Sequence, residues 1–320
     1  MKKLISKWLS ILLPLLLGTF LIIYTFRQYT PEQLATIQHY FRDADYFYIG
    51  ISLIISLLGS ASRAYRWKYS LEHMGYKTTF ANNFMAVSIG YLMNMTIPRS
   101  GEFSRALIIK KYNDIPFDKG FGTIVAERIV DSMVLLLLML IALIVQFDVV
   151  KAFVLDKIPF EKVLWLVTFG VVMMVVAASV YFYSKSQIVA TLKQKISGLK
   201  EGLFSIVQME NKWPYILHTV FIWGSFILMF YVTIFAIDDT RQLGFGAVLT
   251  SFIVGSIAIA VTSSGFGTYP VLVAKILVFY SIAEPAGTAF GWIVWASQIL
   301  LVVLLGAASF LLLPLFNRNK

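Results

Sequence analysis

The stretch TIPRSGEFSRALIIKKY, residues 96–112, decides how this chain is expected to cross a membrane. It follows an apolar segment without a polar linker, and it contains a proline and five charged residues, which are Arg99, Glu102, Arg105, Lys110 and Lys111. Charged side chains are costly inside a bilayer, so their presence where a span is expected needs a structural reason. That reason depends on how the rest of the chain is organised.

The composition indicates an integral membrane protein. Of the 320 residues, 58% are hydrophobic and only 14% are charged, whereas about a quarter of a soluble domain is charged. Cysteine is absent, which excludes disulfides, thiolate nucleophiles and cysteine-ligated metals. The net charge of +10 is more typical of basic cytoplasmic loops than of nucleic-acid binding. Without a long hydrophilic segment, we expect one transmembrane domain over residues 1–320 and no soluble domain.

Nine apolar segments are candidates for membrane crossing. They cover roughly residues 8–26, 46–62, 81–98, 120–147, 163–183, 214–237, 245–262, 268–283 and 286–316, and several are long enough to span a bilayer. The first has the basic start of a signal peptide, but its apolar core is long and no small-x-small cleavage motif follows. We therefore predict an uncleaved first span.

The distribution of lysine and arginine favours a re-entrant hairpin over nine crossings. Nine crossings would leave 11 of these residues inside and 12 outside, before the C-terminal tail, which conflicts with the positive-inside rule. If 81–98 enters from the cytoplasm, turns at IPRSGE and returns as 101–112, the counts become 17 cytoplasmic, 6 external and 4 within the membrane. This arrangement places both termini in the cytoplasm.

A second hairpin that enters from the opposite side of the membrane also keeps both termini in the cytoplasm, although three full crossings would do the same. Segment 245–262 would enter from outside, turn at TSSGFGTYP and return as 268–283. We therefore predict an all-α polytopic fold with about six full spans and two opposed re-entrant hairpins, with eight or nine full spans as the alternative. The halves 1–150 and 160–316 would form an inverted repeat, an architecture typical of transporters.

The connector at residues 186–207 has the pattern of an amphipathic helix. Its apolar residues recur at spacings of three and four, at Ile188, Leu192, Ile196, Leu199, Leu203 and Ile206. Such a helix would lie on the inner leaflet with its lysines toward anionic headgroups. An ordinary solvated connector is the alternative.

Six charged residues are expected to form one intramembrane cluster of zero net charge. They are Arg99, Glu102 and Arg105 of the hairpin and Glu127, Arg128 and Asp131 of the following span. In one interpretation they are an ion-pair lattice that fixes the hairpin to the span. In the other, the arginines bind a phosphate, to which the planar guanidinium is well suited. The amides at the start of the second hairpin helix, near Gly101, would assist, and the carboxylates would orient the arginines or accept a coupled proton.

The second turn carries no charge. It offers hydroxyls, including that of Ser264, and the flexible Gly265 and Gly267, which suit a headgroup or simply supply the backbone angles of a turn. Lys275 follows and would snorkel or bind phosphate. The three histidines lie apart from one another without ligand spacing, so we expect neither a metal nor another cofactor.

The motifs PRSGEFSR (98–105) and AERIVD (126–131) resemble the P-x-x-G-E-x-x-R … x-E-R-x-x-D pattern of the lysylphosphatidylglycerol synthase transmembrane region. The resemblance covers nearly the whole chain. It implies a flippase-like domain that moves a lipid or lipid-linked headgroup between leaflets. The family's second motif is often P-G-G-x-G-like, whereas this chain has SSGFG, a departure that bears on the substrate more than on the fold.

Three functions follow as hypotheses. The first is a flippase or transporter in the inner membrane for an anionic phospholipid or a polyprenyl-phosphate-linked headgroup. The second is a membrane scaffold or accessory subunit of envelope lipid metabolism, in which the charged cluster is structural. The third is an intramembrane enzyme acting on a headgroup, which the residues favour least because they show no catalytic arrangement. The lipid, the direction of transport, its energy coupling and the presence of a homo-oligomer are left open.

Overall fold

The computed structural model describes residues 22–157, 208–262 and 264–318, with residues 16, 19, 20 and 186 and scattered positions between 161 and 180. Its helices are α2 (Pro31–Asp43), α3 (Tyr46–His73), α4 (Phe80–Thr96), α5 (Ser100–Asn113), α6 (Phe117–Val145), α7 (Phe147–Lys157), α10 (Lys212–Thr233), η1 (Ile234–Ala236), η2 (Asp238–Thr240), α11 (Phe245–Val261), α12 (Thr268–Val278) and α13 (Glu284–Phe316). The predicted spans 8–26 and 163–183 and the predicted amphipathic helix 186–207 lie largely or wholly outside the described residues.

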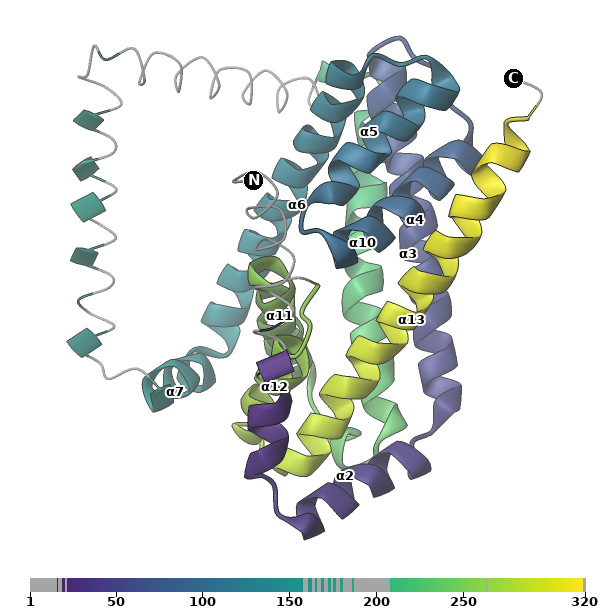
Figure 1. Ribbon diagram of the computed structural model, residues 1–320. Coiled ribbons are helices and arrows are strands. Elements are labelled where there is room, and N and C mark those ends of the chain that lie inside the picture. The colour runs from purple at the N-terminus through teal and green to yellow at the C-terminus, as the bar shows by residue number, and fades with distance from the viewer. Residues whose placement is uncertain are drawn as a thin grey trace, which may run out of the picture.

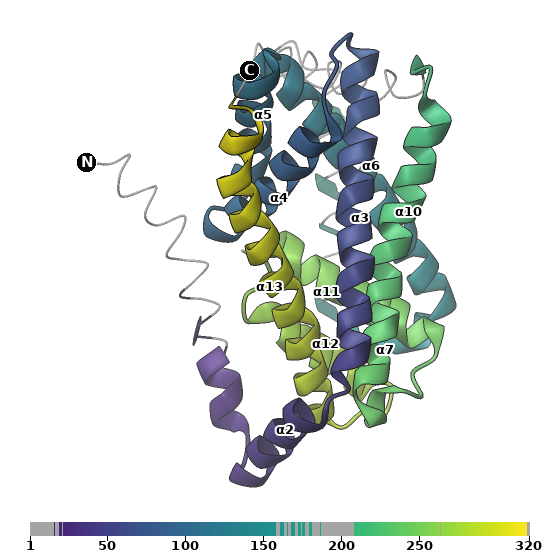
Figure 2. The same ribbon diagram turned by 90° about the vertical axis from the view of Figure 1, so that its right-hand side faces the viewer.

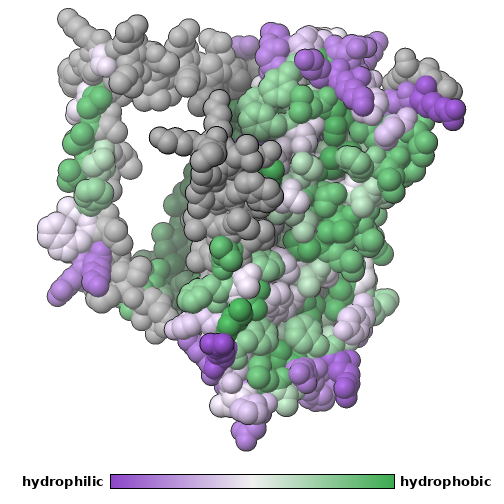
Figure 3. Space-filling view, viewed as in Figure 1, coloured by the Kyte–Doolittle hydropathy of each residue, from purple (hydrophilic) through white to green (hydrophobic). Residues whose placement is uncertain are grey.

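Within the described part of the chain, four helices are long and apolar enough to cross a membrane. They cover Tyr46–His73, Phe117–Val145, Lys212–Ala236 and Glu284–Phe316. The surface in Figure 3 has a hydrophobic middle between hydrophilic ends, as expected of a protein embedded in a bilayer. The expectation of an all-helical, multi-pass membrane protein is confirmed.

Helix α3 is longer than the sequence predicts. Its apolar segment was expected to end at residue 62, but the helix continues to His73. The helix continues through Arg63 and buries its side chain, which the hydropathy of the segment does not predict. The count of cytoplasmic lysine and arginine given above includes Arg63 and Arg66, whereas the helix buries both side chains in the interior of the protein.

Helices α4 and α5 form a first hairpin, which occupies the upper half of the molecule in Figures 1 and 2. Its tip is the turn at residues 97–99. The two helices approach so closely that a Cβ atom at Gly101 would lie 2.1 Å from the carbonyl oxygen of Gly90. The Gly101 amide donates to Asn94 Oδ1 at 2.7 Å, which fixes the turn from within.

Helices α11 and α12 form a second hairpin in the lower half of the molecule (Figures 1 and 2). Its tip is the turn at residues 262–267, where Ser264, Gly265 and Gly267 adopt positive φ angles. Glycine supplies such angles without a steric penalty, so the interpretation of the glycines as turn residues is confirmed. The two tips meet, because Ser264 Oγ donates to the Asn94 carbonyl oxygen at 3.5 Å.

Each hairpin is followed by a long helix that contacts both hairpins. Helix α6 packs on α5 and on α11, and helix α13 packs on α12 and on α4. Glycines permit close approach: a Cβ atom at Gly120 of α6 would lie 2.5 Å from Ile109 Cδ1. A Cβ atom at Gly291 of α13 would lie 2.8 Å from the Pro270 backbone. Each long helix therefore links the two hairpins through direct packing contacts.

The far ends of α6 and α13 are held by side-chain amides. Asn317, the C-cap of α13, exchanges two hydrogen bonds with Asn82 of α4, at 2.8 and 3.1 Å, and Asn82 also donates to Asn113 at 3.2 Å. We call these three residues the upper clasp, since this end of α13 is at the top of Figure 1. Each member contributes a different helix end, so the clasp closes the base of the first hairpin.

A similar contact closes the base of the second hairpin. Gln146, the C-cap of α6, accepts a hydrogen bond from the Tyr280 hydroxyl at 3.1 Å. Its amide covers Gly246 of α11, where a Cβ atom would lie 2.1 Å from Gln146 Nε2. We call Gln146, Gly246 and Tyr280 the lower clasp. In both clasps the last residue of a long helix contacts the first turn of the hairpin in the other half.

Replacing Asn317 with alanine is expected to destabilise the protein by about 1–3 kcal/mol, because the buried Asn82 Oδ1 atom loses the hydrogen bond that Asn317 donates. In a double-mutant cycle with Asn82→Ala, the two changes should couple by about 0.5–3 kcal/mol. The measurement is unfolding in mixed micelles, with Asn211→Ala as control because the exposed Asn211 makes no capping bond. Additive effects of the two clasp substitutions would contradict the assignment.

Candidate functional site

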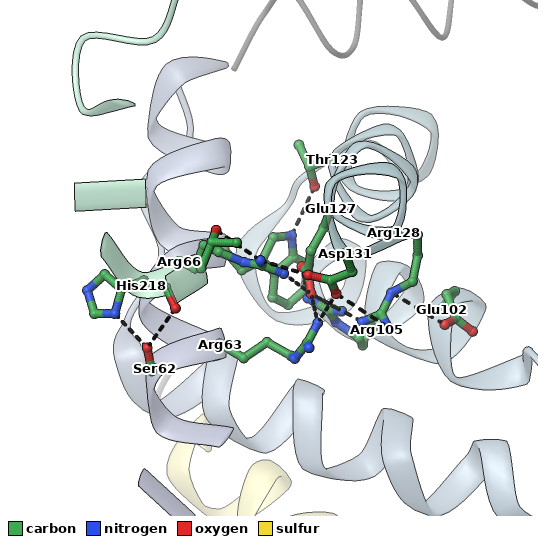
Figure 4. Close-up of polar contacts among 12 residues, drawn as sticks. Ser62, Arg63, Arg66, Glu102, Arg105, Thr123, Glu127, Arg128, Asp131 and His218 are labelled. Carbon is green, nitrogen blue, oxygen red and sulfur yellow. Dashed lines mark hydrogen bonds and ion pairs between the residues drawn. The ribbon is translucent and has the colours of Figure 1, made fainter. Parts of the chain in front are cut away.

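Seven charged side chains from α3, α5 and α6 gather in one place (Figure 4). We call them the arginine–carboxylate cluster, and they are Arg63, Arg66, Glu102, Arg105, Glu127, Arg128 and Asp131. The cluster lies between helices α3, α5 and α6, which bury small and apolar residues around the charged side chains. It is therefore not part of a polar loop.

Glu127 is the centre of the cluster, since it contacts all four arginines. Its Oε1 atom lies 2.6 Å from Arg63 Nη1, 3.2 Å from Arg66 Nη2 and 3.2 Å from Arg128 Nη2. Its Oε2 atom accepts a hydrogen bond from Arg105 Nη2 at 2.9 Å. Charge-assisted contacts of this length are the strong class of hydrogen bonds, so Glu127 joins the three helices.

Asp131, one turn further along α6, repeats part of this pattern. It lies 2.6 Å from Arg63 Nη1 and 2.8 Å from Arg66 Nη1, and Arg66 also donates to Thr219 Oγ1 of α10 at 3.1 Å. The cluster therefore reaches a fourth helix through a neutral hydroxyl.

Trp67 supports the buried arginines from the side. The Arg105 guanidinium carbon lies 4.2 Å from the centre of the indole ring, a distance at which a cation is attracted to the ring face. The indole N–H donates to Thr123 Oγ1 at 2.9 Å, and this fixes the plane of the ring against α6. Arg105 is thus held by a carboxylate and an aromatic ring together.

The expected zero-sum cluster of six residues is wrong in its membership and in its charge. Four guanidiniums face three carboxylates, which gives a formal charge of +1. The sequence interpretation left out Arg63 and Arg66 because it assigned them to a loop. Their i, i+3 spacing on a helix is the signal that could have found them, had α3 been extended past residue 62.

Arg99 lies outside the cluster. It is the N-cap of α5 with a left-handed backbone, φ 63°, and its side chain is exposed at the tip of the first hairpin. It was expected to share a helical face with Glu102 and Arg105, but α5 begins only at Ser100, so the helical spacing does not apply. Within the described residues Arg99 makes no ion pair, and this leaves its guanidinium available at the tip.

The remaining predicted site residues take no part in the ion pairs of the cluster. The Gly101 amide already donates to Asn94. In the second tip, the Ser264 carbonyl accepts from Trp295 Nε1 at 2.9 Å, and the region around Gly265 is filled, with Tyr269 Cβ 2.9 Å from where its Cβ would stand. Lys275 is exposed in the last turn of α12, eight residues after Gly267 of the tip.

One Ser–His contact lies near the cluster. Ser62 Oγ and His218 Nδ1 are 2.7 Å apart (Figure 4), and the His218 ring stacks on Tyr65 at 5.8 Å. No described carboxylate contacts this histidine, so the pair joins α3 to α10 without forming a triad. Among the described residues no group of His, Asp and Glu is arranged to hold a metal ion.

Comparison with known proteins gives a family and two partial relatives. Over 92 residues the chain is 33% identical to a UPF0104 membrane protein of Methanocaldococcus jannaschii, covering 28% of this chain and 27% of that protein. Over 90 residues it is 28% identical to the glycosyltransferase AglD of Haloferax volcanii, covering 28% of this chain and 14% of that protein. No solved structure matches.

The third comparison covers nearly the whole chain. The family model described as the lysylphosphatidylglycerol synthase TM region matches residues 11–306. This range contains both hairpins and every member of the arginine–carboxylate cluster. The chain belongs to the lysylphosphatidylglycerol synthase TM region family.

Proposed function

We propose that this protein is a flippase or transporter that moves a lipid with a phosphate-bearing headgroup between the leaflets of the cell membrane. The observation that carries the proposal is the excess of arginine in the interior. An unpaired arginine at the centre of a membrane costs about 2.5–3.5 kcal/mol even on lenient scales. A surplus guanidinium at such a depth is best explained by an anionic ligand, and the phosphate of a lipid is the anion that a bilayer supplies.

The depth of the cluster follows from helix geometry. Arg63 lies ten residues before the end of α3, and Glu127 lies ten residues after the start of α6. At 1.5 Å per residue both are about 15 Å from those helix ends, which is half the thickness of a hydrocarbon core of about 30 Å. A headgroup bound there would lie within the hydrocarbon core, between the two leaflets.

In the topology proposed here, the hairpins are re-entrant and about six helices cross. With Arg63 and Arg66 assigned to the interior, the cytoplasmic count of lysine and arginine falls from 17 to 15, against 6 outside. This asymmetry supports the proposal that both termini lie in the cytoplasm. Irregular backbone at the two tips is tolerated at this depth only where it faces protein or a cavity, and the contact between Ser264 and Asn94 is consistent with that requirement.

The proposal includes an inverted repeat of two halves. Its support is the matched packing of α6 and α13 on the two hairpins and the equivalent positions of the upper and lower clasps. Helices in such repeats open alternately to the two sides of the membrane. We propose that the upper and lower clasps are the contacts that open, each at one side of the membrane.

A structural role for part of the cluster is favoured by its burial. Arg63, Arg66 and Arg105 are at most 4% exposed and pair with Glu127, and Arg63 and Arg66 also pair with Asp131. In a scaffold protein, these buried ion pairs would be sufficient to hold the helices together. The two functions differ in whether lipid crosses the membrane, and this can be measured directly.

The test is transport of a fluorescent phospholipid in proteoliposomes. Because the chain has no cysteine, an Asn82→Cys/Asn317→Cys variant can be bridged specifically with a short bis-methanethiosulfonate reagent. Transport is expected in the reduced protein, a fall to a tenth or less after bridging, and recovery on reduction. Rates equal to protein-free vesicles in the wild type, for phospholipids and polyprenyl phosphates alike, would contradict the proposed function. Transport that persists after bridging would contradict only the role of the upper clasp.

A further inference from the structure

Arg128 differs from the other arginines of the cluster in its exposure. Its side chain is 38% exposed, whereas that of Arg66 is fully buried. Its contacts are also longer, at 3.2 Å to Glu127 and 3.8 Å to both Asp131 and Glu102. In Figure 4 it lies with Glu102 on the side of the cluster away from α3. Arg128 is therefore the arginine of the cluster that a ligand reaches first.

Glu102 is the most weakly held carboxylate of the cluster. Among the described residues it makes one ion pair, the 3.8 Å contact with Arg128, and its Oε2 atom is buried without a hydrogen-bond partner. Glu127, by contrast, contacts four arginines. An incoming anion would therefore displace Glu102 from Arg128 more easily than it would displace any other carboxylate.

An apolar surface leads to this pair along the contact between α5 and α6. The Phe103 ring lies 4.9 Å from Phe121 and 6.2 Å from Phe117, and those two rings are 5.5 Å apart. At 3.6 residues per turn, Phe117, Phe121 and Arg128 fall within about 40° of one another around α6. Phe103 is 52% exposed and directly follows Glu102. We call Phe103, Phe117 and Phe121 the phenylalanine trio.

We propose that the surface formed by the phenylalanine trio, Arg128 and Glu102 binds one anionic phospholipid. The phosphodiester pairs with Arg128 and releases Glu102, and an acyl chain lies on the three rings. The guanidinium can grip two phosphate oxygens at once, and the released Glu102 would then be free to accept a proton. The choice of a lipid rests on the proposed function, whereas the binding itself can be measured without transport.

The experiment is native mass spectrometry of delipidated protein titrated with dioleoylphosphatidylglycerol. Arg128→Gln is expected to weaken lipid binding at least tenfold. Glu102→Gln is expected to strengthen it about three- to tenfold, because the competing carboxylate is removed. The control is Arg241→Gln, which alters an exposed i, i+3 pair with Asp238 and should leave binding unchanged. Unaltered thermal unfolding midpoints would show that the variants are folded.

A binding site predicts weaker lipid binding by Arg128→Gln and stronger lipid binding by Glu102→Gln. If the ion pair were only structural, both substitutions would reduce binding. Unchanged binding by Arg128→Gln, or weaker binding by Glu102→Gln, would overturn the proposal. Displacement of the lipid by an equal concentration of inorganic phosphate would overturn the choice of a lipid. Binding as expected in a protein that transports nothing would uphold this site and contradict the proposed function.

Discussion

Replacing Glu127 with glutamine is expected to destabilise the protein by about 3–5 kcal/mol, the largest effect that we anticipate for a single side chain. The substitution keeps the size of the side chain but removes the charge that four arginines contact. Breaking a buried ion pair from one side leaves uncompensated charge in the interior, and this accounts for the magnitude. The measurement is the free energy of unfolding in mixed micelles titrated with sodium dodecyl sulfate.

The matched control is Glu72→Gln on α3. Glu72 pairs with Lys68 at 3.5 Å, but both side chains are about one-third exposed, and exposed pairs contribute about 1 kcal/mol or less. If the Glu127 and Glu72 variants were equally stable, the central role given to Glu127 would be wrong.

The second large effect is expected for Gly101→Ala. The added methyl group would stand 2.1 Å from the Gly90 carbonyl oxygen, and neither backbone can move without separating α4 from α5. Overpacking of this kind costs about 1–3 kcal/mol and at times more. Loss of the Gly101–Asn94 hydrogen bond should add to it. We therefore expect a lower unfolding midpoint and slower transport together.

Gly122→Ala provides the comparison for Gly101, because both are helical glycines. Nothing lies within 4 Å of a Cβ atom at Gly122. There alanine should be neutral or stabilise the helix by up to about 1 kcal/mol. Equal effects at the two positions would mean that close approach of the hairpin helices does not matter for stability.

Much of the fold could be predicted because its signals are local. The predicted segments 81–98, 245–262 and 286–316 agree with α4, α11 and α13 to within a few residues. Hydropathy identifies an apolar helix whether it faces lipid or the protein interior, and proline or glycine marks where a hairpin turns. These features depend on residues that are neighbours in the sequence.

The composition of the site was predicted only in part, because it depends on contacts between distant segments. Arg63 is 64 residues from Glu127 along the chain, and a hydropathy pattern contains no information about a contact partner so distant in the sequence. Arg63 follows the apolar segment 46–62 and was therefore counted among the cytoplasmic arginines. A carboxylate supplied by α6 reverses that expectation. The six expected residues have a net charge of zero, so the sequence gives no indication that further arginines belong to the cluster.

The two clasps have a consequence for how the membrane potential acts on the molecule. Asn82, Asn113 and Asn317 at one end, and Gln146 and Tyr280 at the other, are neutral side chains. A charge that crosses the full membrane contributes about 2.3 kcal/mol per 100 mV, but opening either clasp moves no charge. Breaking the clasp contacts themselves should therefore be insensitive to voltage, whereas movement of a charged headgroup should not be, so that lipids of different charge would respond differently to the same potential.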